Sequence, residues 1–233
     1  MQPKIRDIIL EISEDVVNNL PSSFEKKYYG KMNYSSKNNV LASDKNLLRK
    51  TIGFEIAFIH TIAYFLVYDS SGSRDYTHML STLDTDKLFS WYQITNDDII
   101  SQLSNCKPSS QNDIYELINE HDKFIDKDVK KKLGQFYTPT GIAKKMVSEI
   151  KTDLKALSEP DLIVDPACGT GVFVVETVKQ MNVFFAFDKL LEFVENNIFA
   201  YDVNPFSVIA TKISILNTLL DIAPDSVYKN NLL

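Results

Sequence analysis

The stretch LIVDPACGTGVF, residues 162–173, constrains the fold more than any other part of the chain. It opens with an apolar run at residues 162–164, which is typical of a parallel strand buried on both faces. Asp165 and Pro166 end that strand, and glycines follow before a second apolar period begins at Val172. This order of strand, tight turn and helix predicts an α/β sheet with a ligand site at the carboxyl end of the strand.

The turn itself is suited to close contact with a ligand. Gly169 and Gly171 lack a Cβ atom and accept positive φ angles, so a bound molecule can lie directly against the backbone. Thr170 is predicted to cap the helix that follows. A lone GxG also occurs in turns that bind nothing, and no GK[ST] follows here, which excludes a P-loop.

The full string DPACGTG resembles motif I of the S-adenosylmethionine-dependent methyltransferases. The version is that of the amino-methylating DNA methyltransferases of the type I and type IIG restriction-modification families. The resemblance implies a Rossmann-like class I domain and S-adenosyl-L-methionine as cofactor. It also implies that Asp165 holds the methionine ammonium group, directly or through water, while the backbone of residues 167–171 lies against the cofactor.

A second motif stands upstream of the first, in the order that these families show. GQFYTP, residues 134–139, resembles their motif X, and about 26 residues separate the two motifs. By this resemblance Tyr137, Thr138 and Pro139 line the methionine end of the cofactor pocket. The residues by themselves indicate a helix–loop–helix joint: Gly134 ends one helix and Thr138 or Thr140 caps the next. The apolar residues expected to share a face of that next helix are Ile142, Met146, Val147 and Ile150.

Two acids compete to bind the cofactor ribose at the end of the next strand. Asp188 ends VFFAFD, which has strand character and falls close to the roughly 20-residue spacing of dinucleotide-binding folds. Asp202 ends NIFAYD, and residues 202–205 match the family pattern of acid, aliphatic residue, Asn or Asp, and Pro. We choose Asp202, with Val203 against the adenine ring, and expect residues 183–197 to be a largely helical insertion. The stretch after Asp202 predicts a helix with Ile209, Ile213, Leu216 and Leu220 on one face.

The resemblance therefore implies twelve cofactor-binding residues and no metal ligand. They are Tyr137, Thr138, Pro139, Asp165, Ala167, Cys168, Gly169, Thr170, Gly171, Phe173, Asp202 and Val203.

The catalytic tetrapeptide of the family, NPPY or a close relative, does not occur in the sequence. Residues 204–207 read NPFS, which lacks the second proline and sits at the motif II position. The motif III acid that would bind the adenine amino group and a target-recognition domain are also missing. We assign no catalytic residue and expect an N-terminal part of a longer enzyme, with an incomplete sheet, or a truncated product that needs a partner.

The first half of the chain has helical periodicity throughout. Residues 5–20 and residues 43–67 predict two long helices, the second capped by Ser43 or Asp44 and apolar nearly all round. Shorter helices are expected within 76–92 and 96–104 and from about Ile114. Because no strand pattern or PD-(D/E)xK constellation precedes residue 130, we predict a helical domain over 1–125, without a nuclease, and a methyltransferase portion over 126–233.

Charge and composition limit the partners. A net charge of −6 does not predict a surface that grips nucleic acid throughout, since phosphate contact needs a basic face. Two local stretches, FEKKYYGKMNY at 24–34 and the lysines 127 and 130–132, are compatible with DNA contact, but solvated surfaces look the same. We therefore expect double-stranded DNA to bind through segments largely outside this chain.

The location of the protein is inferred from what the sequence lacks. Cys106 and Cys168 have no disulfide or metal spacing, and the N-terminus carries acids where a signal peptide is uncharged, so we expect a reducing, cytoplasmic setting. The apolar stretch 52–68 contains Glu55 and His60 and is shorter than the roughly 20 residues of a membrane span. It is predicted to be a buried core helix, with His60 bonded to a backbone partner.

Three functions are consistent with these patterns. The first is the cofactor-binding part of an adenine-N6 DNA methyltransferase from a restriction-modification or phage-defence system, working with a specificity or restriction subunit. The second is a methyltransferase acting on cytosine N4 or a protein glutamine. The third is a truncated, non-catalytic assembly module. GQFYTP favours the DNA enzymes over the glutamine enzymes, and the missing NPPY favours the third for this chain.

Overall fold

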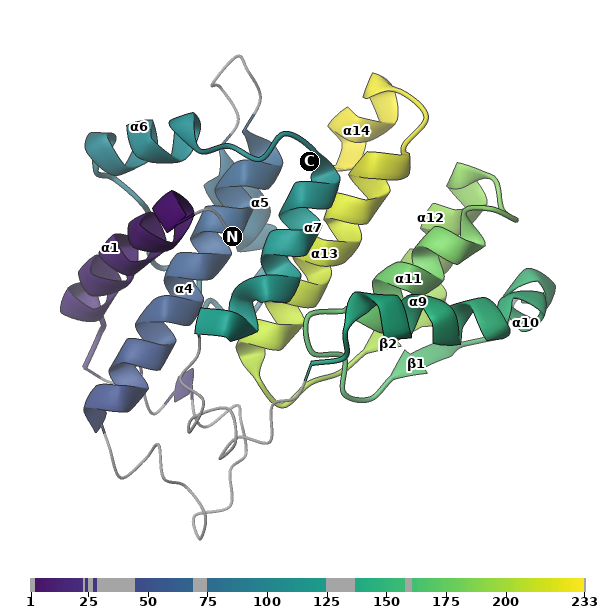
Figure 1. Cartoon of the computed structure of the whole chain (residues 1–233), viewed down its shortest axis with the longest axis horizontal. Helices are drawn as coiled ribbons and strands as arrows, with labels where there is room; N and C mark the ends of the chain where they lie inside the picture. Colours follow the sequence, from purple (N-terminus) through teal and green to yellow (C-terminus); the bar gives the residue numbers. More distant parts are fainter. Residues whose placement is uncertain are drawn as a thin grey trace, which may run out of the picture.

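The computed structural model describes residues 3–22, 24, 27–28, 45–68, 75–124, 137–157 and 161–232. Helices dominate these residues, with one small sheet (Figure 1). The elements are α1 (Pro3–Asn19), α4 (Lys45–Val67), α5 (Tyr76–Leu83), α6 (Asp97–Asn105), α7 (Gln111–Glu120), the 3-10 helix η1 (His121–Phe124), α9 (Thr140–Glu149), α10 (Lys151–Ala156), β1 (Ile163–Asp165), α11 (Val172–Met181), α12 (Phe187–Asn197), β2 (Ile198–Ala200), α13 (Pro205–Ile222) and α14 (Ser226–Leu232).

The described part of the first half is helical, as the sequence predicts. The helix expected within residues 76–92 is present as α5 but ends at Leu83, and residues 84–92 form turns. The carboxylate of the buried Asp84 accepts hydrogen bonds from the backbone N–H groups of Leu88, Phe89 and Ser90, at 3.1, 2.7 and 2.7 Å. These bonds compete with the helix for the backbone and stop it at this acid.

Helix α4 is the centre of the first core. Two helical stretches, Asn46–Val67 and Pro205–Ile222, are long and apolar enough to cross a membrane by length and composition. Of their apolar 18-residue segments, 89% and 67% are buried inside the protein. The apolar side chains of α4 pack against α1, α7 and α13, which satisfies them within the fold. His60 is buried and its Nε2 lies 3.0 Å from the carbonyl oxygen of Phe89, so the prediction of a core histidine with a backbone partner is confirmed.

Helix α1 packs tightly against α4 at Gly53. A Cβ atom built there lies 2.5 Å from Val17 Cγ2 and 3.0 Å from the Ser13 carbonyl oxygen. Gly53→Ala is therefore expected to lower the free energy of unfolding by about 1–2 kcal/mol, because overpacking outweighs the gain in helix propensity. Gly141→Ala is the control: its Cβ meets nothing within 4 Å, so we expect a gain of about 0.5 kcal/mol. Urea unfolding of both variants measures the difference, and equal effects would contradict this packing.

The sheet has two parallel strands, β1 and β2, in the described chain. In the pairing Ile163↔Ile198, both side chains pack against the second core, formed chiefly by α9, α11, α12 and α13. The next pair, Val164 and Phe199, points to the other face, where Val164 is 56% exposed. The prediction of a strand buried on both faces was therefore wrong: the described residues cover one face only.

The segment between the strands settles a second expectation. Residues 187–197 form α12, as predicted for a helical insertion, and Asp188 lies exposed in its first turn rather than at a strand end. Asp202, by contrast, lies just beyond β2, beside the end of β1.

Helix α13 joins the two halves of the molecule. The predicted stripe of Ile209, Ile213, Leu216 and Leu220 is buried in the first core, together with Phe206. Leu219 packs in the second core, and Figure 1 shows α13 between the two groups of helices. The predicted boundary near residue 125 falls at 125–136, outside the described residues, and stays a prediction.

Two details of α9 differ from expectation. Its N-cap is Pro139, without a side-chain cap bond, and Thr140 is its first residue. Its buried side chains are Ala143 and Val147, whereas Ile142, Met146 and Ile150 are exposed. Only the narrow face of α9 that packs against α11 is buried. The spacing of apolar residues therefore predicted a wider buried face than the structure has. The expected cap residues Ser43 and Asp44, the lysines 127 and 130–132, and most of residues 24–34 lie outside the described residues.

Candidate functional site

The turn between β1 and α11 is tied to the end of β2. The N–H of Tyr201 donates to the Asp165 carbonyl and the N–H of Cys168 donates to the Tyr201 carbonyl, both at 2.8 Å. Gly169 and Gly171 have φ angles of +55° and +87°, as the glycine pattern predicts. Gly171 is the N-cap of α11, so the predicted cap at Thr170 was wrong: the Thr170 hydroxyl instead lies 3.4 Å from Asn119 Oδ1 of α7.

Helix α13 packs against this turn at Thr211. A Cβ atom at Gly171 would lie 3.0–3.2 Å from the side chain and Cα of Thr211. The Thr211 hydroxyl donates to the Gly169 carbonyl at 2.9 Å. Gly171 is thus required by helix packing as well as by its φ angle, a role that sequence inspection did not assign.

Asp202 binds the turn directly. Its Oδ2 accepts from the Gly169 N–H at 2.9 Å and its Oδ1 accepts from the Asn204 N–H at 2.8 Å. The following residue, Val203, is 63% exposed. The half-buried carboxylate of Asp202 therefore adds to the backbone hydrogen bonds that hold the end of β2 to the glycine turn.

Asp165 has an unused carboxylate oxygen. Its Oδ1 accepts from the Ala167 N–H at 3.1 Å, whereas Oδ2 is buried without a hydrogen-bond partner among the described residues. A buried, unsatisfied acceptor is costly, so a bound ammonium or N–H group at Oδ2 would recover that free energy. This atom fits the donor expected from the methionine end of S-adenosyl-L-methionine.

Tyr137 covers Gly169. Its ring lies 3.3 Å from where a Gly169 Cβ would be, so the residues of motifs X and I are in contact. The ring of buried His121 stands edge-on to Tyr137 with centroids 4.6 Å apart, and packs on Phe206 at 4.8 Å. Nothing in the sequence pattern singled out His121, which links η1 to Tyr137 and to Phe206 at the start of α13.

The other predicted cofactor-binding residues surround this turn unevenly. Thr138 is half-buried beside Tyr137, whereas Pro139 and Ala167 are exposed. Phe173 is partly buried against the second core. Cys168 is buried, and burial raises the pKa of its thiol to about 11, so it stays protonated at neutral pH and is not a nucleophile.

A buried polar network from the helical half reaches the same place. The Glu55 carboxylate of α4 accepts hydrogen bonds from the Tyr28 hydroxyl and, at 3.0 Å, from Asn204 Nδ2. Burial raises the pKa of Glu55 to about 7, although both hydrogen bonds favour its charged form. The sequence held one signal for this site, a charged residue inside an apolar helix, but not its partners.

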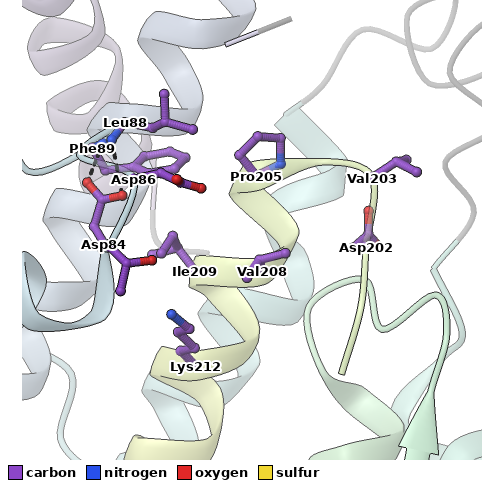
Figure 2. Close-up of a pocket in the computed structure, with 11 residues that line it drawn as sticks. Asp84, Asp86, Leu88, Phe89, Asp202, Val203, Pro205, Val208, Ile209 and Lys212 are labelled. Carbon is purple, nitrogen blue, oxygen red and sulfur yellow. Dashed lines mark hydrogen bonds between the residues drawn. The ribbon is translucent and has the colours of Figure 1, made fainter. Parts of the chain in front are cut away.

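A pocket of about 160 Å³ adjoins Asp202 and Val203 on the side of the helical half (Figure 2). The turn at residues 84–89 forms one wall and the start of α13 forms the other. Lys212 donates to the Leu83 carbonyl at 2.6 Å and so fixes α13 to that turn. The helical half thus borders the predicted adenosine side of the site.

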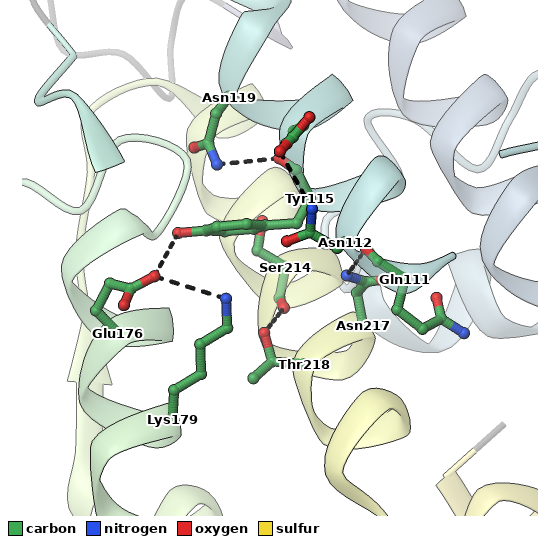
Figure 3. A network of polar contacts seen from close by, with 10 residues as sticks. Gln111, Asn112, Tyr115, Asn119, Glu176, Lys179, Ser214, Asn217 and Thr218 are labelled. Carbon is green, nitrogen blue, oxygen red and sulfur yellow. Dashed lines mark hydrogen bonds and ion pairs between the residues drawn. The ribbon is translucent and has the colours of Figure 1, made fainter. Parts of the chain in front are cut away.

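A second polar network lies between α7, α11 and α13 (Figure 3). The Tyr115 hydroxyl donates to Glu176 at 3.4 Å, and Lys179 lies 3.6 Å from Glu176 and 4.2 Å from the Tyr115 ring centroid. Asn217 Nδ2 donates to the Gln111 carbonyl at 2.9 Å. These contacts join helices and do not reach Asp202. In the described chain no three His, Cys, Asp or Glu side chains gather as a metal site would require.

Comparison with known proteins identifies similarity over the same region. Residues 110–220 match the N-6 DNA methylase family. The type II methyltransferase M.VspI of Vibrio sp. (strain 343) is 29% identical over 126 residues, which is 54% of this chain. The chain spans 26% of the length of that relative. No solved structure matches. The two similarities support an N6 DNA methyltransferase.

Proposed function

We propose that this chain is the cofactor-binding part of a site-specific DNA methyltransferase that transfers a methyl group from S-adenosyl-L-methionine to adenine N6. One observation carries the proposal: Tyr137 and Asp202, from the two motifs that flank the glycine turn, both contact Gly169. The match of residues 110–220 to the N-6 DNA methylase family supports it, as does the chain's spanning only a quarter of its longer relative.

Each part of the cofactor has a matching group in this proposal. The free Oδ2 of Asp165 takes the ammonium group, the backbone of 167–171 lies along the methionine part, and Tyr137, Thr138 and Pro139 close that end. Asp202 takes the ribose hydroxyls: each carboxylate oxygen has accepted one N–H and retains a second lone pair. Val203 then lies against adenine. The cofactor supplies the methyl group, and these residues bind and orient it.

The target base must be handled by other segments. Methylating an exocyclic amine requires extruding the base from the duplex and aligning its nitrogen with the methyl group, work we assign to an NPPY-type motif. A recognition domain and a specificity or restriction subunit would supply DNA binding in a cytoplasmic type I, type IIG or phage-defence system.

Two other functions compete with this one. Methylation of cytosine N4 or of a protein glutamine would use the same cofactor site. A non-catalytic assembly module would retain the fold without the chemistry. The match to the N-6 DNA methylase family favours adenine over cytosine N4 and protein glutamine. A measurement of cofactor binding distinguishes part of an enzyme from a non-catalytic module.

Methyl transfer tests the proposal directly. We expect tritiated methyl groups to enter unmethylated DNA with a longer gene product that includes an NPPY-type motif and a recognition domain, but not with the 233-residue chain alone. Asp165→Asn in the longer protein should reduce incorporation, because a neutral amide holds an ammonium group poorly. Sustained, cofactor-dependent incorporation by the chain alone would mean that a residue without an assigned catalytic role does the chemistry.

A further inference from the structure

The buried Glu55 lies in α4, in the helical first half of the chain, but forms a hydrogen bond with Asn204 in the second half, which contains the predicted cofactor site. It lies in the middle of α4 and is only 2% exposed. A carboxylate placed in a core is expensive to desolvate, so its partners must compensate for it. Those partners are Tyr28, from the first half, and Asn204, which caps α13.

Asn204 uses all its polar atoms in fixed directions. Its Oδ1 accepts from the Phe206 N–H at 2.9 Å, which caps α13. Its Nδ2 donates to Glu55 at 3.0 Å, and its backbone N–H donates to Asp202. The capping bond fixes only the amide oxygen of Asn204. The second bond, from Nδ2 to Glu55, fixes the orientation of the amide plane as well.

An unbroken series of hydrogen bonds thus runs from α4 to the glycine turn. Its links are Glu55 to Asn204, Asn204 to Asp202 and Asp202 to the Gly169 N–H, each between 2.8 and 3.0 Å. Asp202 is half-buried, so packing restrains its side chain less than it would restrain a fully buried one.

We propose that Glu55 is a positioning residue that holds Asp202, through Asn204, in the orientation that receives the cofactor ribose. The inference rests on the proposed function for its ligand, but the restraint on the 202–204 turn exists without any ligand. The helical half therefore contributes to cofactor binding without touching the cofactor.

Three variants separate this role from core packing. Glu55→Leu keeps the volume and removes both acceptors. Glu55→Gln keeps the network: its oxygen accepts from Asn204, its nitrogen donates to the Tyr28 oxygen, and the Tyr28 hydroxyl turns to Asn204 Oδ1, 3.4 Å away. Asn204→Ser retains the cap on α13 and cuts the link to Glu55. Glu176→Leu is the matched control, another buried glutamate that accepts from a tyrosine.

Amide exchange measured by NMR on the full chain reads the restraint. In Glu55→Leu and Asn204→Ser, we expect exchange at the Gly169 amide to rise about tenfold more than at the Ile59 amide, which reports global opening. Glu55→Gln should stay within about twofold of the unaltered chain. Glu176→Leu should raise exchange at both amides equally. The affinity for S-adenosyl-L-methionine, measured by calorimetry, should follow the same order.

Two results would overturn the proposal. One is amide exchange in Glu55→Leu that rises by the same factor at Gly169 and Ile59. The other is amide exchange at Gly169 that rises as much in Glu55→Gln as in Glu55→Leu. If Glu55→Leu does not fold, Asn204→Ser decides by the same criterion. If the unaltered chain binds no S-adenosyl-L-methionine, the proposed function fails, and amide exchange still decides the role of Glu55.

Discussion

Replacing Asp202 by alanine is expected to weaken the binding of S-adenosyl-L-methionine by about 1.5–3 kcal/mol, roughly 10- to 150-fold. That range is the value of hydrogen bonds to a charged group, here those to the ribose hydroxyls. The same change frees the Gly169 and Asn204 N–H groups that Asp202 accepts from, so the loss should lie near the upper end. Calorimetry on the chain, or on the longer enzyme, measures it.

Asp188→Ala is the control for this prediction. Asp188 lies exposed in the first turn of α12, where it favours the helix but is not at the end of a strand. Its removal should leave cofactor affinity within about twofold. Weaker binding in Asp188→Ala together with normal binding in Asp202→Ala would show that the ribose-binding acid was assigned to the wrong residue.

Glu55→Gln is expected to remove a pH-dependent contribution of about 3 kcal/mol to the free energy of unfolding. The figure follows from the pKa shift of Glu55 at about 1.36 kcal/mol per pKa unit. Burial raises the pKa of Glu55 from 4.5 to about 7. Between these values the folded state holds a proton that the unfolded state releases, so stability falls as pH rises, and the full cost is present above pH 7. The groups that face Glu55 are the Tyr28 hydroxyl and the Asn204 amide. Relative to the unaltered chain, Glu55→Gln should therefore gain stability from pH 4 to pH 8.

His60 produces the opposite slope. Burial lowers its pKa from 6.5 to about 4, against smaller opposing effects of the Phe89 carbonyl and of Asp84. Tyr76 and Tyr92 also face it. Its contribution is present above pH 6.5 and is lost as pH falls to 4, again by about 3 kcal/mol. The two slopes offset each other between pH 4.5 and 6.5 in the unaltered chain.

Urea unfolding from pH 4 to pH 8 measures both effects. The free energy of unfolding of Glu55→Gln should rise from pH 4 to 6.5, because the contribution of His60 is then no longer offset by that of Glu55. His60→Gln should show stability that falls from pH 4.5 to 7. Parallel curves for all three proteins would mean that neither buried group titrates as its surroundings imply.

The sequence by itself determined the local elements and the order of the motifs. Gly169 and Gly171 have the positive φ angles that their residue type suggested, and α13 buries the stripe its spacing predicted. These features depend on neighbours within a few residues, so pattern and propensity are enough to find them. The helix α12, within the segment expected to be a largely helical insertion, was likewise predicted.

Only the tertiary structure decided which groups meet across the chain. Thr170 was expected to cap α11 and faces Asn119 instead, and Gly171 is required by Thr211, which lies in a later helix. Glu55 was visible as a charge in an apolar helix, but its bonds to Tyr28 and Asn204 span 27 and 149 residues. Periodicity carries no information about such distant pairs. They are selected because a buried charge must find its partners wherever packing places them.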